Sequence, residues 1–188
     1  AGTGYGSYLW STGETTQTID VDSSGMYSVT VGEQSSNNHS LDFDGVDDYV
    51  EVLSSSSLDF SQDFTIQAWW NKRLGSAENS LWTIGNSYLD GLELYVGSSG
   101  NVTKVYSQGS EQILANINPI LNEWHSYTVT RENGVIKLYI DGVQETNTWT
   151  SNTSFTGNIV IGHEVYINPS QTPPPIWCDG WIDNFQVW

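Results

Sequence analysis

Five carboxylates crowd into residues 41–52, LDFDGVDDYVEV, a short segment that contains no lysine or arginine. They are Asp42, Asp44, Asp47, Asp48 and Glu51, and Gly45 marks an expected turn among them. Two interpretations fit this pattern. Aspartates at a polar hairpin tip can accept hydrogen bonds from backbone amides. Alternatively, the carboxylates and the carbonyls of the turn can bind a hard cation such as calcium, which takes about six to eight oxygen ligands.

Four aromatic residues lie near expected loops and are candidates for binding a ligand. Trp82 and Tyr88 flank Gly-Asn-Ser, Trp149 lies in TNTWTSNTS, and Trp177 follows NPSQTPPP. Aromatic rings stack on the flat C–H faces of sugars, while nearby Asn, Asp and Gln side chains bond the hydroxyl groups. The alternative is that each ring packs under a loop as part of the core. We take these four residues as the candidate carbohydrate-binding set.

Residues suited to catalysis are scarce in this chain. The three histidines, His39, His125 and His163, are widely separated and show no metal-ligand spacing. No Gly-x-Ser-x-Gly segment occurs. The single cysteine, Cys178, is expected to be a small buried hydrophobic residue. The sequence therefore predicts a protein that is not an enzyme.

Composition restricts the partners of the chain. Its 188 residues include 22 acidic and only 5 basic residues, for a formal net charge of −17. Phosphate groups and anionic membranes are bound by clustered Lys and Arg, so we exclude nucleic acid and expect no direct membrane insertion. Neutral ligands and divalent cations remain. The composition is typical of secreted β-proteins, and the start at AGTGYGSYLW indicates a fragment or a processed product.

The elements that must position these residues are all strands. Short runs rich in β-branched and aromatic residues alternate with turn residues from residue 15 to the end of the chain. Two tight hairpins are expected, at Asn133-Gly134 and at Asp141-Gly142, because these dipeptides tolerate positive φ angles. Residues 1–32 provide about three strands, which is too few for a domain. We expect a linker at 33–38 and one complete domain at 39–188.

The N-terminal segment resembles the closing strands of the immunoglobulin-like repeats in large surface proteins of Bacteroidetes. The matching residues are the Trp10-Ser11-Thr12-Gly13 turn, the Thr15-Thr16-Gln17 entry and the alternation from Gly25 to Val31. This resemblance implies that residues 1–32 are the C-terminal part of such a repeat. We expect an open, incomplete sheet there.

Residues 39–188 resemble the laminin-G-like branch of the concanavalin A-like lectin/glucanase superfamily. The resemblance is carried by LDFDGVDDYVEV, FTIQAWW, NEWHSYTVTRENGVIKLYIDGVQ, IVIGHE and GWIDNFQVW in this order. It implies an all-β, two-sheet antiparallel jelly-roll sandwich, in which Trp70 and Trp124 resemble core positions of the family. Since successive side chains of a strand point to opposite faces, we expect the sandwich to bury at most one of Trp69 and Trp70 fully. The strands with the clearest alternation provide eleven expected core residues: Phe64, Ile66, Ala68, Tyr127, Val129, Leu138, Ile140, Ile159, Ile161, Ile182 and Phe185. Members often carry a structural calcium where an Asp of the last strand meets the first strands, and Asp183 matches that position. The resemblance thus implies a site formed by Asp44, Asp47, Asp183 and Asp48. Asp183 is otherwise expected to accept amide hydrogen bonds from the first hairpin.

The same resemblance bears on activity. Glucanases of this fold carry a Glu-x-Asp-x-x-Glu pattern, whereas DGLELYVG offers only Asp90 and Glu93, out of phase by one residue. We therefore expect a non-catalytic, lectin-like module for adhesion or targeting, calcium-stabilised and part of a larger secreted or cell-surface protein. Its partners would be a polysaccharide or glycan, or a protein, and other domains of the same chain. The alternative is a structural or protein-binding spacer of a surface adhesin; exposed aromatic rings on one face would favour sugar binding.

Overall fold

The computed structural model describes residues 5–33, 40–55, 58–73, 78–85, 91–97, 102–164 and 176–188. The chain divides into two compact units, Ala1–His39 and Ser40–Trp188. All regular elements among the described residues are β-strands. No helix in this part of the chain is long and apolar enough to cross a membrane.

The first unit contains one two-stranded antiparallel sheet, formed by β1 (Tyr5–Trp10) and β2 (Val29–Glu33). The strand expected at residues 15–21 is absent, which corrects the sequence prediction. The connection is instead fixed by local bonds: the Trp10 indole Nε1 donates to the Thr16 carbonyl oxygen at 2.8 Å. Each strand has a single partner among the described residues, so the sheet is open. Its relation to immunoglobulin-like repeats stays a prediction.

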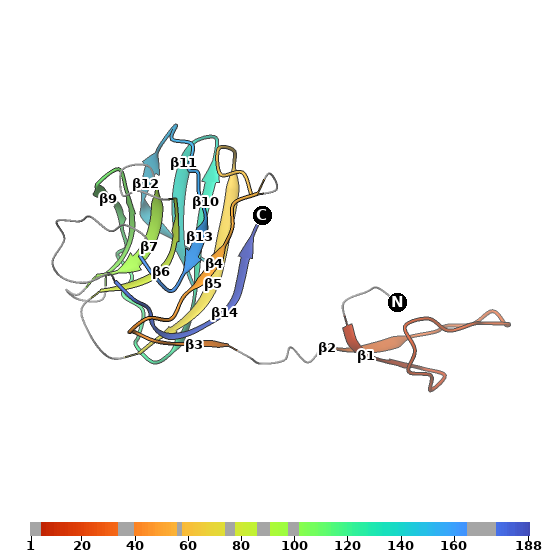
Figure 1. The fold of residues 1–188 in the computed structure, drawn as a ribbon. Coiled ribbons are helices and arrows are strands. Elements are labelled where there is room, and N and C mark those ends of the chain that lie inside the picture. The colour runs from red at the N-terminus through yellow and green to blue at the C-terminus, as the bar shows by residue number, and fades with distance from the viewer. Residues whose placement is uncertain are drawn as a thin grey trace. The chain divides into compact units, whose positions relative to one another are not determined.

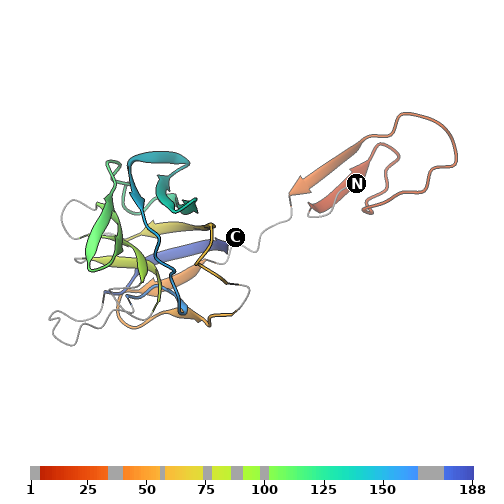
Figure 2. The ribbon, with the colours of Figure 1, turned by 90° about the horizontal axis from the view of Figure 1, so that it is seen from above.

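The second unit is a sandwich of two six-stranded antiparallel sheets, as predicted (Figures 1 and 2). Sheet I has the order β12 (Val143–Thr150), β11 (Val135–Ile140), β10 (Trp124–Glu132), β5 (Phe64–Lys72), β14 (Asp179–Val187) and β3 (Leu41–Asp44). Sheet II has the order β4 (Val50–Val52), β13 (Ile159–Ile161), β6 (Asn79–Ile84), β7 (Leu92–Val96), β8 (Thr103–Ser107) and β9 (Ser110–Leu114). Figure 2 shows β14, in blue, between β5 and β3.

Both predicted tight turns are present. Asn133 and Gly134 have φ angles of 50° and 78°, and Asp141 and Gly142 have 51° and 75°. Two consecutive residues with positive φ give a turn whose twist matches that of the flanking strands. These turns fix the register of β10 to β11 and of β11 to β12, and thereby one half of sheet I.

The core lies between the two sheets and follows the alternation of the strands. Ten of the eleven core residues expected from sequence are buried: Phe64, Ile66, Ala68, Tyr127, Val129, Leu138, Ile140, Ile159, Ile161 and Ile182. Phe185 is only half-buried, because a bulge at Asn184, with φ 51°, shifts the register of β14 against β5. Cys178 is buried as expected.

Candidate functional site

Two consecutive tryptophans of β5 point to opposite faces of sheet I. Trp70 faces the core and is 1% exposed, whereas Trp69 faces outward and is 38% exposed. Successive side chains of a strand alternate in this way, so the outward row of β5 also contains Thr65 and Gln67. The sequence prediction that the sandwich fully buries at most one of the two tryptophans is confirmed.

A second exposed tryptophan lies beside Trp69 on the next strand. Ser126 of β10 pairs with Trp69, and Trp124 stands two residues from Ser126 on the same side of the sheet. Diagonal neighbours of this kind have Cβ atoms roughly 7 Å apart. Trp124 is 41% exposed. The expectation that it is a core residue is therefore wrong, because its register places it in the outward row, opposite Asn71.

A hollow of about 400 Å³ lies at the other end of the same face. It is lined by Asp63, Phe64, Thr65, Thr130, Arg131, Glu132, Tyr139 and Trp188. The backbone of Trp188 exchanges two hydrogen bonds of 3.0 Å with Thr65, which places its 62%-exposed ring beside the outward row of β5. Trp69 is four positions after Thr65, so the hollow lies about 13 Å along the strand from the paired tryptophans.

We name this surface the aromatic face and define it by Trp69, Trp124, Tyr139 and Trp188 with the intervening Gln67, Thr128, Thr130 and Asp183. Gln67 pairs with Thr128, which in turn pairs with Tyr139, so polar side chains connect the two aromatic ends. Flat rings with hydroxyl and amide groups between them can stack on sugar rings and bond their hydroxyl groups. The aromatic face therefore has the chemistry of a glycan platform.

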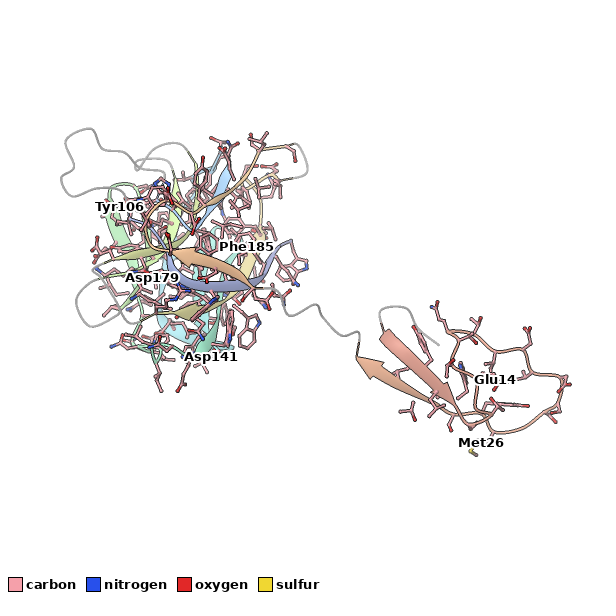
Figure 3. All side chains as sticks on the ribbon, turned by 60° about the horizontal axis from the view of Figure 1, so that its bottom comes forward. Glu14, Met26, Tyr106, Asp141, Asp179 and Phe185 are labelled. Atoms are coloured by element: carbon pink, nitrogen blue, oxygen red, sulfur yellow. The ribbon has the colours of Figure 1, made fainter. Side chains whose placement is uncertain are left out.

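Asp183 belongs to this face and not to the acidic loop, defined here as residues 44–48. Asp183 pairs with Trp69, and its Oδ1 accepts a hydrogen bond of 2.7 Å from the Asn184 amide. Asp44 pairs with Asp179, which lies four residues earlier on β14. Figure 3 labels Asp179 and Phe185, and Asp183 lies between them on the strand. Since four strand residues span about 13 Å, Asp183 and Asp44 do not meet at one ion.

The aspartates of the acidic loop bind backbone amides. Asp44 Oδ1 accepts a hydrogen bond of 2.9 Å from the Val46 amide, and Asp48 Oδ2 accepts one of 3.1 Å from the Asp44 amide. Asp47 is exposed. In the described part of the chain, no three metal-ligating side chains come together as a metal site. The predicted ligand set is therefore not assembled, and calcium binding itself stays a prediction.

The positive charge next to this region comes from Arg73, which sequence reasoning missed. Its guanidinium donates to the Phe43 carbonyl at 2.8 Å and to Asp179 Oδ1 at 3.0 Å, and it forms an ion pair with Asp42. It also lies 4.0 Å from the centre of the Trp181 ring. Arg73 therefore joins β3 to the middle of sheet I. Its partners are far from it in the sequence, so no local pattern predicted these contacts.

The four candidate rings of the sequence analysis have different fates. Trp82 is fully buried in the core, so it offers no face to a sugar. Tyr88 lies outside the described residues. Trp149 is half-buried against the core, with its ring centre 6.2 Å from that of Phe155. Trp177 is half-buried and lies 4.0 Å from the His163 ring, close to Tyr49.

The sequence comparison assigns the sandwich to a known family. The laminin G-like family, described as Concanavalin A-like lectin/glucanases superfamily, matches residues 44–188. The chain belongs to this family. No curated protein matches the sequence.

Solved structures share the fold of this laminin G-like domain at low sequence identity. Domains LG4-5 of the mouse laminin α1 chain are 17% identical with a TM-score of 0.56, over 88% of this chain and 44% of theirs. The CBM40 module of Ruminococcus gnavus IT-sialidase, bound to α2,3 sialyllactose, is 14% identical with a TM-score of 0.56, over 80% and 90%. Domain 4 of AbnA, a GH43 extracellular arabinanase from Geobacillus stearothermophilus, in complex with arabinotriose, is 16% identical with a TM-score of 0.52, over 73% and 65%. The chain thus spans less than half of the laminin pair.

The outer face of sheet II in this laminin G-like domain carries two buried carboxyl groups, Glu93 and Glu164. Glu93 pairs with Thr83 and Tyr106, and its Oε1 has no hydrogen-bond partner among the described residues. Burial, followed by the charge of Glu164, raises the pKa of Glu93 well above its usual value. Burial also raises the pKa of Glu164 to about 7. Alternation along β7 indicates that Glu93 faces outward. Glu164 lies outside the strands, so no sequence pattern indicated that it would be buried beside Glu93.

Proposed function

We propose that this chain is a non-catalytic carbohydrate-binding module that binds glycans on its aromatic face. The observation that carries the proposal is the pair of exposed tryptophans, Trp69 and Trp124, on adjacent strands of one rigid sheet. Rings held by a sheet lose little conformational freedom on binding, which favours affinity. The structural likeness to modules described with sialyllactose and arabinotriose supports carbohydrate binding in general, without indicating the face or the sugar.

The competing assignment is a structural or protein-binding spacer without sugar binding. That assignment would be favoured by a smooth polar face with buried tryptophans. Instead, Trp69, Trp124 and Trp188 are 38%, 41% and 62% exposed. Isolated exposed aromatic residues are ordinary, but three on one face together with a hollow form a continuous apolar and polar surface typical of a binding site. We therefore favour sugar binding.

The proposal includes a place in a larger protein. We assign the module to a secreted or cell-surface protein, where it would serve adhesion or target an attached domain to polysaccharide. Its composition, poor in lysine and rich in serine, threonine and aromatic residues, is consistent with this role.

Glycan binding can be tested with two single substitutions and a matched control. Trp69→Ala and Trp124→Ala each remove one ring of the platform, and each should weaken binding to any glycan found on an array by about tenfold, the equivalent of about 1.4 kcal/mol. The control is Tyr49→Ala, which removes a 56%-exposed ring from outside the aromatic face. All three variants should keep the wild-type circular dichroism spectrum.

Two outcomes would count against the proposal. If the folded wild-type protein bound no glycan on an array of plant, microbial and animal polysaccharides, the spacer assignment would replace it. If Tyr49→Ala weakened binding as much as Trp69→Ala, the aromatic face would not be the site.

A further inference from the structure

The five basic side chains of this protein are all described, and each is either buried or paired with a carboxylate. Two of them are buried in the sandwich. Arg131 is 7% exposed and donates to three backbone carbonyls, those of Phe60 at 3.2 Å, Thr153 at 2.8 Å and Ser151 at 3.1 Å. Lys72 is 4% exposed, and burial lowers its pKa. Arg131 is one of the residues that line the hollow, but its guanidinium already bonds these three carbonyls. Lys72 lies on the inward side of β5.

The other three basic side chains are held by carboxylates. Arg73 is paired with Asp42 and Asp179, as described above. Lys104 forms an ion pair with Glu111 on sheet II. Arg73 borders the aromatic face, because it stacks on Trp181, which pairs with Asn71 on the outward side of sheet I. Lys104 lies on sheet II, and both cations are neutralised by their carboxylate partners.

Lys137 is the one cation whose strand position is on the outward side of sheet I near the hollow. It pairs with Thr130, and its Nζ lies 3.2 Å from Oε2 of Glu132. Glu132 lines the hollow together with Asp63, and Asp183 stands beside Trp69. Asp63, Glu132 and Asp183 carry three negative charges against the two positive charges of Lys137 and Arg131, so the described ionisable groups of the aromatic face and its hollow sum to −1.

Histidine does not change this balance in the described part of the chain. His125 bonds Asp141 at 2.7 Å and the Ile120 carbonyl at 3.1 Å, on the inward side of β10. His163 lies in the ring cluster with Trp177, and burial lowers its pKa. Proteins select anionic sugars with unpaired Arg or Lys side chains, because a carboxylate or sulfate needs a charge-assisted partner when it loses water.

We propose that the aromatic face selects uncharged glycans and rejects those that carry sialic acid, uronic acid or sulfate. This inference rests on the proposed function, because it names the ligand class of the same site. An anionic sugar would meet carboxylates at Asp63, Glu132 and Asp183, and it would approach a protein of net charge −17. A neutral sugar meets the same carboxylates as acceptors for its hydroxyl groups.

The test compares glycans that differ by one charge. Wild-type protein is titrated at pH 7.5 in EDTA with neutral oligosaccharides and with the same oligosaccharides bearing one sialic acid, uronic acid or sulfate. Binding should be at least about tenfold tighter for the neutral member of each pair. The ratio of the two affinities should decrease at high salt, because screening weakens the repulsion between the anionic sugar and the carboxylates. EDTA removes calcium, which would otherwise bridge an anionic sugar to a carboxylate.

The outcomes separate the two claims. Equal binding within the pairs overturns the selectivity and leaves glycan binding in place. Failure of every member to bind overturns the proposed function and the selectivity with it. Binding of neutral members alone supports both.

A gain-of-function variant tests whether the ion pair with Glu132 prevents Lys137 from binding anionic glycans. Glu132→Gln removes its carboxylate partner, so binding of the anionic members should rise several-fold. Glu14→Gln, in the separate N-terminal unit, makes the same change in net charge and is the matched control. If both variants changed the affinity for anionic glycans equally, the ion pair between Glu132 and Lys137 would not be the reason for the selectivity. The inference that charges of the aromatic face select neutral glycans would then be wrong.

Discussion

The buried carboxyl group of Glu164 should make this protein less stable as the pH rises. Its pKa is raised from 4.5 to about 7, first by burial and then by the nearby charge of Glu78. Between these two pH values the folded protein keeps a proton that the unfolded chain has released. Raising the pH therefore lowers the free energy of unfolding. The stabilisation is complete below pH 4.5 and is lost as the pH rises through about 7.

The size of the effect follows from the shift. A rise of this extent corresponds to about 3 kcal/mol of stability lost between pH 4.5 and 8. Glu93 acts in the same direction, because its own pKa is raised by burial and by the charge of Glu164. The carboxyl groups share one environment, so their losses are not independent.

Urea unfolding at pH 5, 6, 7 and 8 measures this loss. Glu164→Gln keeps the shape of the side chain without the charge, so its stability should change much less over this range and should exceed that of wild type at pH 8. The control is Glu123→Gln, an exposed residue with the same change in net charge. The reasoning is refuted if wild type gains stability from pH 5 to 8, or if the two variants keep the same slope with pH.

Three further predictions concern the acidic loop and its neighbours. Gly162→Ala should lower the free energy of unfolding by about 3 kcal/mol, because φ is +88° and the new Cβ would lie 2.3 Å from the ring of Phe43. Gly142→Ala is the control: its φ is +75° and no atom lies within 4 Å, so it should cost only about 1 kcal/mol. Urea unfolding measures both losses. Arg73→Met should cost about 2 kcal/mol, against less than about 1 for Lys104→Met, since Arg73 loses a carbonyl, two carboxylates and a ring contact; equal losses would contradict its bridging role. Excess calcium should raise the midpoint of thermal unfolding above that in chelator, and identical midpoints would leave amide binding as the role of the loop.

Local patterns predicted the features of this fold that depend on neighbouring residues. Alternation along β5 gave the buried and exposed sides of Trp70 and Trp69, and the two Gly-containing dipeptides gave the hairpins of sheet I. The sandwich itself came from the order of its strand motifs. For the strand faces and the hairpins the determining interactions lie within a few residues of one another, whereas the sandwich was inferred from the resemblance of the ordered motifs to a known family.

Features that depend on register were beyond the sequence. Trp124 is a different case: it was expected in the core, although alternation from Tyr127 and Val129 along β10 already places it on the outside, opposite Asn71. Asp183 was expected beside the acidic loop, but it pairs with Trp69, four positions along β14 from the residue that pairs with Asp44. Arg73 meets Asp42 and Asp179 only because β3 and β14 are neighbours. No local propensity encodes how far one strand slides past another.

The position of β14 has a consequence for when sheet I can form during synthesis of the chain. This strand, residues Asp179–Val187, lies between β5 and β3 in sheet I. Residues 41–187 must therefore all be synthesised before β3 can pair with its neighbour. Until then β5 and β3 are held apart, with one edge of β5 unpaired and apolar side chains exposed. Such a sheet closes late and over long sequence distances, which makes folding slow and the nascent chain prone to association.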